Sequence, residues 1–413
     1  MRILIVSQYF WPEQFRINDL ALALKERGHE VTVLTGMPNY PSGRLFEGYS
    51  WFKKHCDNMA GISIYRVPLF LRRQGRGWQL ALNYLSFALS ACLLGCWFLR
   101  KQKFDVVFVF EPSPFTVGIP AILLRRLKRA PMLFWVQDLW PESLSATGAV
   151  KSKRVLALVG RMVRMIYRHC DRVLIQSRGF MERVVQSGAD RERVRYFPNW
   201  AESFYQPVEH SLSSDTGEEM PDGFRMMFAG NLGSAQSLGT IVEAAELLKD
   251  DPEMQWVIVG NGRQKQWMEN QVERRGLQKC FHFLGAKSAE LMPNYLSQAD
   301  ALLVTLRSDP IFALTIPSKI QSYLACGKPV VAALDGEGAK VVEESGAGFT
   351  ISSGDAGGLA EIVQKMKVMD ESKRIEMGNS AKQYYDKHFD QKQLMNQLES
   401  WMNEVIKEGL CES

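Results

Sequence analysis

Two segments of this chain place glycine and other small residues where a loop leads into a helix. Residues 228–236 (FAGNLGSAQ) continue a hydrophobic strand, and residues 315–331 (TIPSKIQSYLACGKPVV) follow later in the same half of the chain. A helix start offers unpaired backbone N–H groups and about half a positive charge. Small residues let a phosphate approach that backbone closely. Together with Lys319, the two segments predict a cradle for a diphosphate such as that of a sugar nucleotide.

Short hydrophobic strands alternate with amphipathic helices along the chain. The expected strands are residues 2–6, 31–34, 62–67, 105–110, 132–136, 171–176 and 194–197, then 224–229, 255–259, 280–284, 300–305 and 329–333. Such βαβ alternation predicts an α/β fold with two Rossmann-like, doubly wound domains. Ligands of such sheets bind beyond the carboxyl ends of the strands, so we expect two domains that face an interdomain cleft.

The domain boundaries follow from where this alternation stops. We expect an N-terminal domain at 1–200, a linker without hydrophobic periodicity at 201–222, and a C-terminal nucleotide-binding domain at 223–385. Residues 386–413 predict a final helix that packs back toward the N-terminal domain. The chain begins directly on a strand, so we expect no secretory signal.

Charge is divided unevenly between the two halves. Residues 1–200 hold 30 lysines and arginines against 14 acidic residues, whereas the whole chain has 50 against 45. The seven cysteines are scattered without a CxxC pair, which favours a reducing compartment and no zinc site. No Asp-x-Asp motif occurs, so no metal is expected at the site.

Residues 78–99 (WQLALNYLSFALSACLLGCWFL) contain no charge. As one helix they would be about 33 Å long, enough to cross a bilayer. A crossing would divide strands that belong to one sheet, so we expect the helix to lie in one membrane leaflet, with complete burial in the domain or a true span as alternatives. The residues expected at the membrane are Leu82, Leu85 and Leu89 with the flanking Arg72, Arg73, Arg100 and Lys101.

Several short motifs occur in an order that resembles a known family. They are residues 27–35 (RGHEVTVLT), 228–233 (FAGNLG), 259–262 (VGNG) and 325–331 (ACGKPVV). The chain is similar to retaining glycosyltransferases of family 4, which have the GT-B fold. Residues 35–41 (TGMPNYP), 138–143 (DLWPES) and 317–319 (PSK) further resemble the WbuB-like branch of bacterial polysaccharide and O-antigen glycosyltransferases.

This resemblance implies a reaction and its partners. It implies transfer of a sugar, such as N-acetyl-L-fucosamine, from a UDP-sugar to a polyprenyl-diphosphate-linked saccharide in surface polysaccharide or lipopolysaccharide synthesis. The anomeric configuration would be retained, and the enzyme would work without a metal or other cofactor. The protein would then be cytoplasmic and peripheral or monotopic at the inner membrane, with no nucleic-acid partner.

The chain departs from the family at the donor site. Many relatives carry Arg and Lys at the positions of Asn231 and Gln236, and a pair of Glu at the positions of Leu314 and Ser322. Lys319, with Arg263 as a second cation, can replace the lost charge. The expected donor-binding residues are therefore Gly230, Asn231, Gly233, Gln236, Gly262, Arg263, Ser318, Lys319 and Ser322.

Three carboxylates of the first domain are candidates for the catalytic base. Asp138 and Glu142 follow one strand and Glu111 ends another, at the edge where cleft residues belong. Asp138 could instead cap a helix that begins at Pro141. Gln137 stands where relatives often carry a His that touches the donor sugar. A front-face route, in which the leaving phosphate takes the proton, needs no dedicated base.

The acceptor is expected to bind near the first two strands of the N-terminal domain. The glycine pair common in relatives is missing from residues 12–19, where Glu13 stands beside Arg16 and Asn18. The expected acceptor-binding residues are Arg16, Asn18, Asn39 and Tyr40. For Arg16, a surface ion pair is the alternative.

Two other functions fit parts of this pattern. A UDP-sugar 2-epimerase has the same architecture but no use for an apolar membrane helix. A non-catalytic sugar-nucleotide-binding scaffold at the membrane would explain the missing Glu pair. A dehydrogenase is disfavoured because residues 6–12 (VSQYFWP) lack the glycine fingerprint after the first strand.

Overall fold

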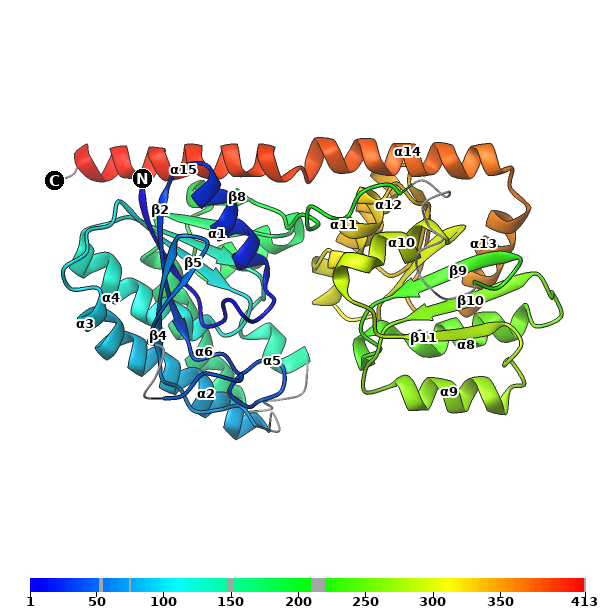
Figure 1. Cartoon of the computed structure of the whole chain (residues 1–413), viewed down its shortest axis with the longest axis horizontal. Helices are drawn as coiled ribbons and strands as arrows, with labels where there is room; N and C mark the ends of the chain where they lie inside the picture. Colours follow the sequence, from blue (N-terminus) through cyan, green and yellow to red (C-terminus); the bar gives the residue numbers. More distant parts are fainter. Residues whose placement is uncertain (52–54, 74–75, 147–149, 151, 209–219, 412–413) are drawn as a thin grey trace. The chain divides into compact units, whose positions relative to one another are not determined.

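The computed structural model describes the chain except for residues 52–54, 74–75, 147–149, 151, 209–219 and 412–413 (Figure 1). It divides into two compact units. Unit 1 comprises Met1–Pro198 and Lys392–Ser413, and unit 2 comprises Asn199–Gln391. Most of the expected linker, residues 209–219, lies outside the described residues.

Unit 1 is built on an eight-stranded sheet in the order β3-β4-β2-β1-β5-β6-β7-β8. Its strands are β1 Arg2–Val6, β2 Glu30–Gly36, β3 Cys56–Met59, β4 Ile62–Val67, β5 Val106–Glu111, β6 Met132–Val136, β7 Arg172–Ile175 and β8 Val194–Tyr196. All neighbours are parallel except β3, which pairs antiparallel with β4. The sequence predicted only parallel strands. It missed β3 because this edge strand is short and polar (CDNM) and has no hydrophobic run.

Helices cover both faces of this sheet. They are α1 Arg16–Glu26, α2 Gly77–Ser90, α3 Cys96–Phe98, α4 Gly118–Lys128, α5 Glu142–Ala146, α6 Lys153–Arg168, α7 Met181–Gln186 and α15 Gln391–Cys411. Strands β5 and β6 are buried along their whole length, as expected when both faces of a parallel sheet are covered. Helix α2 contacts α4 and α4 contacts α6, so these three form one layer, while α1 and α15 lie together on the other side (Figure 1).

Helix α15 joins unit 1 through a row of apolar residues and through ion pairs. Leu394, Met395, Leu398, Met402 and Val405 are buried. The Glu399 carboxylate lies 3.0 Å from Arg27 Nη1 and 2.7 Å from His29 Nε2. The Glu408 carboxylate pairs with Arg172 Nη2 at 2.7 Å. The end of the chain therefore packs on the N-terminal sheet, although almost 200 residues of unit 2 separate them in sequence.

The apolar segment expected at 78–99 is a helix with one irregular turn. Helix α2 continues through a π-helical turn at Ala91–Gly95 into α3, and the whole helical stretch spans Gly77–Leu99. A Cβ on Gly95 would lie 2.7 Å from Leu34 of β2, so this glycine lets the helix approach the sheet closely. About one third of its most apolar window is buried, which excludes the alternative of complete burial in the domain.

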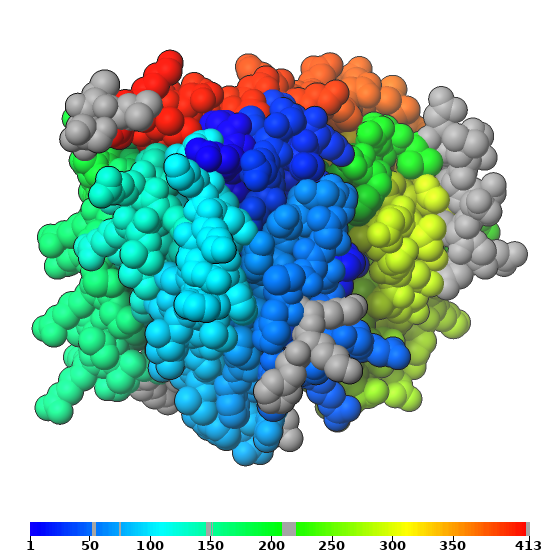
Figure 2. All heavy atoms as spheres, turned by 60° about the vertical axis from the view of Figure 1, so that its left-hand side comes forward, coloured from blue at the N-terminus to red at the C-terminus, as the bar shows by residue number. Residues whose placement is uncertain are grey.

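Helix α2 buries a mixed polar and apolar face (Gln79, Asn83, Phe87 and Ala88) and exposes an apolar one. Two polar side chains point inward: Asn83 accepts a 2.6 Å hydrogen bond from Gln8 and donates one of 2.6 Å to the Phe70 carbonyl, and Gln79 is buried as well. The outer face carries exposed apolar side chains, namely Trp78, Leu82, Leu85, Leu89, Leu93 and Trp97. Figure 2 shows this segment, in light blue to cyan, at the surface of unit 1. An outer face of this kind is unusual for a helix in contact with water.

Unit 2 has a six-stranded, fully parallel sheet in the order β11-β10-β9-β12-β13-β14. The strands are β9 Phe224–Ala229, β10 Met254–Val259, β11 Phe281–Gly285, β12 Ala301–Thr305, β13 Val330–Ala333 and β14 Gly348–Ile351. The helices are α8 Leu238–Leu247, α9 Lys265–Arg274, α10 Met292–Ser297, α11 Ser318–Ala325, α12 Glu337–Glu344, α13 Ala356–Val368 and α14 Glu371–His388. The doubly wound α/β architecture predicted from the sequence is confirmed in both units.

Candidate active site

The loops after β9 and β10 pack backbone against backbone in unit 2. Leu232 N–H donates to the Asn261 carbonyl at 2.9 Å, and Gly230 N–H donates to Val259 at 2.8 Å. A Cβ on Gly260 would lie 1.9 Å from the Gly230 carbonyl, and one on Gly262 would lie 2.4 Å from that of Leu232. The glycines of residues 259–262 (VGNG) are therefore explained by close contact with the neighbouring loop.

Lys319 reaches this loop from the first turn of α11. Its ammonium lies 2.6 Å from the Gln236 Oε1 atom and 3.5 Å from the ring centroid of Phe228. Gly230 has a φ of +134°, which favours glycine, and a Cβ there would lie 2.8 Å from Lys319 Cε and displace the end of the lysine side chain. The structure thus brings together Gly230, Gln236 and Lys319, which the sequence placed in one site.

The surroundings of Lys319 leave its charge uncompensated. No described carboxylate forms an ion pair with it, and its partners are one amide oxygen and one aromatic ring. Burial lowers the pKa of Lys319 well below the usual range. A cation held in this way favours an anionic ligand, because a carboxylate or phosphate would restore the stability of the charged form.

The loop that carries Gln236 is held from the other side by β12. Thr305 Oγ1 donates to the Gln236 carbonyl, and Arg307 N–H donates to Ala235 at 2.8 Å. These bonds fix residues 234–237 between β9 and α8. Hydrogen bonds that hold a binding loop in one conformation lower the entropic cost of binding.

The other expected donor residues are more peripheral. Asn231, Arg263 and Ser318 are exposed, and a Cβ on Gly233 would lie 2.9 Å from the Asn231 amide nitrogen. Ser322 donates to the Ser318 carbonyl at 3.3 Å, within its own helix. These residues lie in the loops after β9 and β10 and in the first turns of α11, the region expected from the sequence.

In unit 1, Glu111 and Asp138 lie at the carboxyl ends of β5 and β6. The backbone N–H groups of Gln137 and Asp138 approach Glu111 Oε2 at 3.4 and 3.5 Å, and Gln137 N–H also donates to the Glu111 carbonyl at 3.1 Å. Burial, followed by the charge of Asp138, raises the pKa of Glu111 well above its usual range. Glu111 is fully enclosed, so it fits a residue that holds the 137–138 loop better than one that contacts substrate.

Asp138 differs from Glu111 because its carboxylate forms no hydrogen bond or ion pair with any described residue. The alternative that Asp138 caps a helix at Pro141 is therefore wrong. Burial alone raises the pKa of Asp138 to about 7, the range suited to a general base at neutral pH. Glu142 is the first residue of α5.

The expected acceptor residues gather around a buried carboxylate, Glu13. Its Oε1 accepts from the backbone N–H groups of Asn39 and Tyr40, both at 2.7 Å. Asn18 donates to the Glu13 carbonyl at 2.7 Å and accepts from Trp11 N–H at 2.9 Å. Arg16 is the first residue of α1. Asn18, Asn39 and Tyr40 are brought together, but the hydrogen bonds of Asn18 and Asn39 serve the loops themselves.

An aromatic cluster that the sequence did not predict lies beside Glu13. Tyr9 stacks on Phe15 at 4.9 Å, and Tyr40 lies 5.7 Å from Tyr9 and 5.2 Å from Phe15. The Arg72 guanidinium covers the Tyr40 ring at 4.8 Å. Tyr40 is 25 residues from Phe15 in sequence, so only the position of both segments after strand ends could have indicated this cluster.

We expect the replacement Glu13→Gln to reduce the pH dependence of stability. Burial raises the pKa of Glu13 to about 7, above its usual 4.5, although the N–H groups of residues 40, 39 and 10 oppose the shift. The unfolded chain then loses this proton first, so the stability that the neutral acid provides is present below pH 4.5 and is lost as pH rises to 7. Glutamine cannot ionise, and a rise of the pKa from 4.5 to about 7 corresponds to about 3 kcal/mol, so the fall in Tm between these pH values should shrink by roughly 7–14 °C.

Thermal unfolding across this pH range measures the effect. The exposed Glu47 provides a matched control, since Glu47→Gln removes the same charge without a buried partner. A Glu13→Gln variant with the full pH dependence of the parent would show that Glu13 ionises normally in the folded chain.

No group of three or more His, Cys, Asp or Glu residues that could hold a metal ion occurs in the described part of the chain.

Family models match both units. Residues 14–200 match a glycosyl transferase 4-like domain, and residues 216–384 match glycosyl transferases group 1. The putative colanic acid biosynthesis glycosyl transferase WcaI of Escherichia coli is 29% identical over 79% of this chain and 82% of its own. The probable glycosyltransferase WbjE of Pseudomonas aeruginosa is 27% identical over 66% of this chain and 68% of its own.

Solved structures share the fold at low identity. HepE of Anabaena, solved with UDP, superposes with a TM-score of 0.69 at 17% identity over the whole of both chains. Sucrose-phosphate synthase of Thermosynechococcus elongatus gives 0.72 at 16% identity, covering 99% of this chain and 100% of its own. WaaG, a glycosyltransferase involved in lipopolysaccharide biosynthesis, gives 0.67 at 14% identity over 94% and 95%.

Proposed function

This chain is a GT-B glycosyltransferase that joins a glycosyl transferase 4-like domain to a group 1 domain, and we propose that it transfers a sugar from a UDP-sugar to a polyprenyl-diphosphate-linked saccharide. The product would be part of a bacterial surface polysaccharide, such as an O-antigen or lipopolysaccharide. The names of WcaI and WaaG, which refer to colanic acid and lipopolysaccharide synthesis, support this class of product. An N-acetylated amino-deoxy sugar such as N-acetyl-L-fucosamine is the proposed donor sugar.

The observation that carries the proposal is the uncompensated ammonium of Lys319 beside Gln236. The diphosphate of the donor would lie against Lys319 and the N–H groups at the starts of α8 and α11. This ammonium takes over the role that a lysine at position 236 has in relatives, from a position 83 residues further along the chain. The UDP bound to HepE supports the choice of nucleotide.

The reaction breaks the bond between the anomeric carbon and the diphosphate oxygen, and the acceptor hydroxyl forms the new bond. We propose a retaining, metal-independent route in which Lys319 and the helix starts stabilise the leaving diphosphate. The proton of the acceptor hydroxyl would go to Asp138 or, in a front-face mechanism, to the leaving phosphate oxygen. Asp138 is the better placed of the three carboxylates, because Glu111 is enclosed by its own loop and the pKa of Asp138 is about 7.

The location at the cytoplasmic leaflet of the inner membrane is proposed from α2 and its neighbours. Residues 72–168 contain 16 lysines and arginines against four acidic residues. The exposed apolar face of α2 supplies one signal for membrane binding and this charge the second. Arg73 covers Phe70 at 5.8 Å and Arg100 covers Trp97 at 3.9 Å, so both ends of the helix pair a cation with an aromatic ring.

Mass spectrometry of a lipid-linked acceptor incubated with the protein and a panel of UDP-sugars tests the proposal. A mass increase of one sugar residue in the presence of one donor is the expected result. An epimerised UDP-sugar formed without an acceptor would favour the 2-epimerase, and donor binding without either product would favour the non-catalytic scaffold. Digestion of the product with anomer-specific glycosidases then reports retention or inversion.

A further inference from the structure

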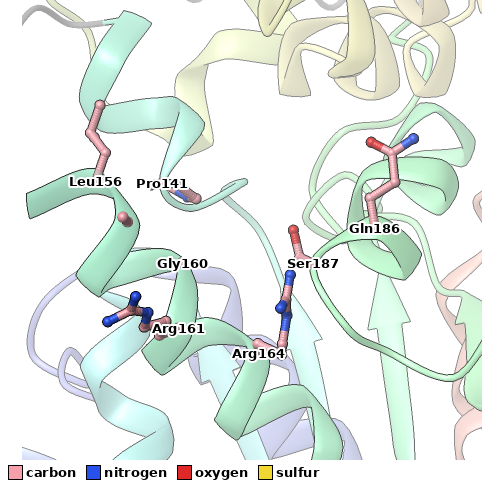
Figure 3. Close-up of a pocket in the computed structure, with 8 residues that line it drawn as sticks. Pro141, Leu156, Gly160, Arg161, Arg164, Gln186 and Ser187 are labelled. Atoms are coloured by element: carbon pink, nitrogen blue, oxygen red, sulfur yellow. The ribbon is translucent and has the colours of Figure 1, made fainter. Parts of the chain in front are cut away.

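A pocket of about 390 Å³ opens in unit 1 between α6, the end of α7 and the loop after β6. Figure 3 shows Gly160, Arg161 and Arg164 on α6, with Arg164 extending toward Ser187 at the end of α7. The full lining is Pro141, Leu156, Ala157, Gly160, Arg161, Arg164, Gln186 and Ser187. This pocket is separate from the Lys319 region, which belongs to the other unit.

The polar side chains of the pocket are hydrogen-bond donors that lack partners. Across the part of the chain that the structure describes, the side chains of Arg161, Arg164, Gln186 and Ser187 form no hydrogen bond or ion pair. Other arginines of the same unit are paired, such as Arg125 with Asp171 at 2.7 Å and Arg172 with Glu408 at 2.7 Å. No described carboxylate lines the pocket. The absence of acidic partners distinguishes this arginine pair from a structural ion-pair network.

Two guanidinium groups with a hydroxyl and an amide match the chemistry of a phosphate or diphosphate. Arginine binds phosphate oxygens through paired N–H donors, and serine and glutamine add further neutral donors. The arginines stand at positions 161 and 164, one turn apart on α6, so they lie on one face of the helix.

The remaining walls are apolar. Pro141, Leu156, Ala157 and Gly160 line the side of the pocket toward the start of α6. The outer face of α6 adds exposed apolar side chains, Val155, Leu158 and Met165, among basic residues, and α6 contains no acidic residue. An anion that is attached to an apolar chain would satisfy both parts of this surface, whereas a free anion would use only the arginines.

We propose that this pocket binds the phosphate or diphosphate group of a membrane lipid. That the group belongs to a lipid rests on the proposed membrane contact of unit 1. That the pocket binds a phosphate or diphosphate does not depend on this contact. Pro141 lies three residues after Asp138 on the same loop, so an occupied pocket would also steady the segment that carries the candidate base. The pocket would thus hold a lipid-borne phosphate close in the chain to the catalytic loop.

The test compares two double variants that remove the same charge from α6. Arg161→Ala with Arg164→Ala removes both pocket arginines, while Arg154→Ala with Arg168→Ala removes two exposed arginines that do not line the pocket. One arm measures inorganic pyrophosphate binding by calorimetry. The other measures binding to phosphatidylcholine vesicles that contain phosphatidic acid, against vesicles in which phosphatidylserine replaces it.

In the pocket variant, we expect pyrophosphate binding to weaken about tenfold or more, the scale of a lost charged hydrogen bond, and the preference for phosphatidic acid to disappear. The control variant should keep both its affinity for pyrophosphate and its preference for phosphatidic acid. Because both variants retain Lys319, any pyrophosphate bound in unit 2 is common to them. Ser187→Glu, which adds a carboxylate to the pocket and keeps both arginines, should reproduce the loss.

Equal losses in the pocket and control variants would overturn the proposal in favour of diffuse electrostatic attraction. Unchanged binding in the pocket variant would overturn it as well. Pyrophosphate binding that depends on the pocket, without any preference for phosphatidic acid, would support the anion site and overturn its lipid origin. The sugar-transfer assay is read separately, so failure of the pocket does not count against the transferase.

Discussion

Replacing Lys319 with alanine should weaken the binding of UDP to this protein by roughly 10- to 150-fold, the equivalent of about 1.5–3 kcal/mol for a hydrogen bond to a charged group. Among the described residues the ammonium has Gln236 and the Phe228 ring as its partners, and neither is an anion as the proposed diphosphate would be. Calorimetric titration of UDP measures the effect. Lys340→Ala is the matched control, because Lys340 is exposed in the same unit and pairs with Glu337 at 2.8 Å.

The same residue should also couple affinity to pH. Burial lowers the pKa of Lys319, so the ammonium is lost, and UDP binds more weakly, as pH rises through the lowered value. Since the folded pKa lies below the unfolded one, the charged lysine costs stability below the lowered pKa, and this cost disappears as pH rises through and above that value. Lys319→Met, which keeps most of the side-chain volume, should therefore raise the Tm of unit 2 while it weakens UDP binding.

If Lys319→Ala binds UDP with an unchanged dissociation constant, Lys319 does not contact the donor. A Lys319→Met variant that loses both stability and affinity would mean that the lysine is a structural residue of the loop.

The overall architecture was predictable because each unit is specified by local patterns. Buried parallel strands such as β5 (VVFVFE) and β10 (MQWVIV) are continuous hydrophobic runs, and the glycine loops mark where strands end. Helix α14 was missed because its sequence (ESKRIEMGNSAKQYYDKH) is mostly polar and buries only Gly378 and Ala381. Helix α14 packs against α11, and this contact between distant segments cannot be read from the local sequence.

The sequence predicted which loops form the candidate site, but it did not predict which side chains hydrogen-bond to one another there. The glycines and the lysine could be assigned to one region, since strand ends meet at one edge of a parallel sheet. The bond between Lys319 and Gln236 joins residues 83 positions apart and depends on the packing of α11 against β9. Glu13 is a similar case: it stands where relatives have a glycine pair, but its contacts with Asn39 and Tyr40 depend on how the loops after β1 and β2 meet.

Introducing two charges on the outer face of α2, Leu85→Lys with Leu89→Lys, should release the protein from membranes. Both leucines are more than half exposed, at 53% and 63%. Each would contribute about 1.5–3 kcal/mol when buried in lipid, so losing both should lower partition into phosphatidylcholine vesicles by about 100-fold or more. Neutral vesicles are the stricter test, because anionic lipids would attract the new lysines by about 1 kcal/mol each.

Leu247→Lys with Val368→Lys is the control for this variant, since both residues are exposed apolar positions on helices of unit 2. It should leave vesicle binding unchanged. The α2 variant should still bind UDP with the parent's affinity, because Lys319 and its loop belong to a separate folded unit. Cell fractionation that finds the unmodified protein entirely in the soluble fraction would contradict the proposed membrane contact. The exposed leucines of α2 would then need an explanation other than contact with lipid.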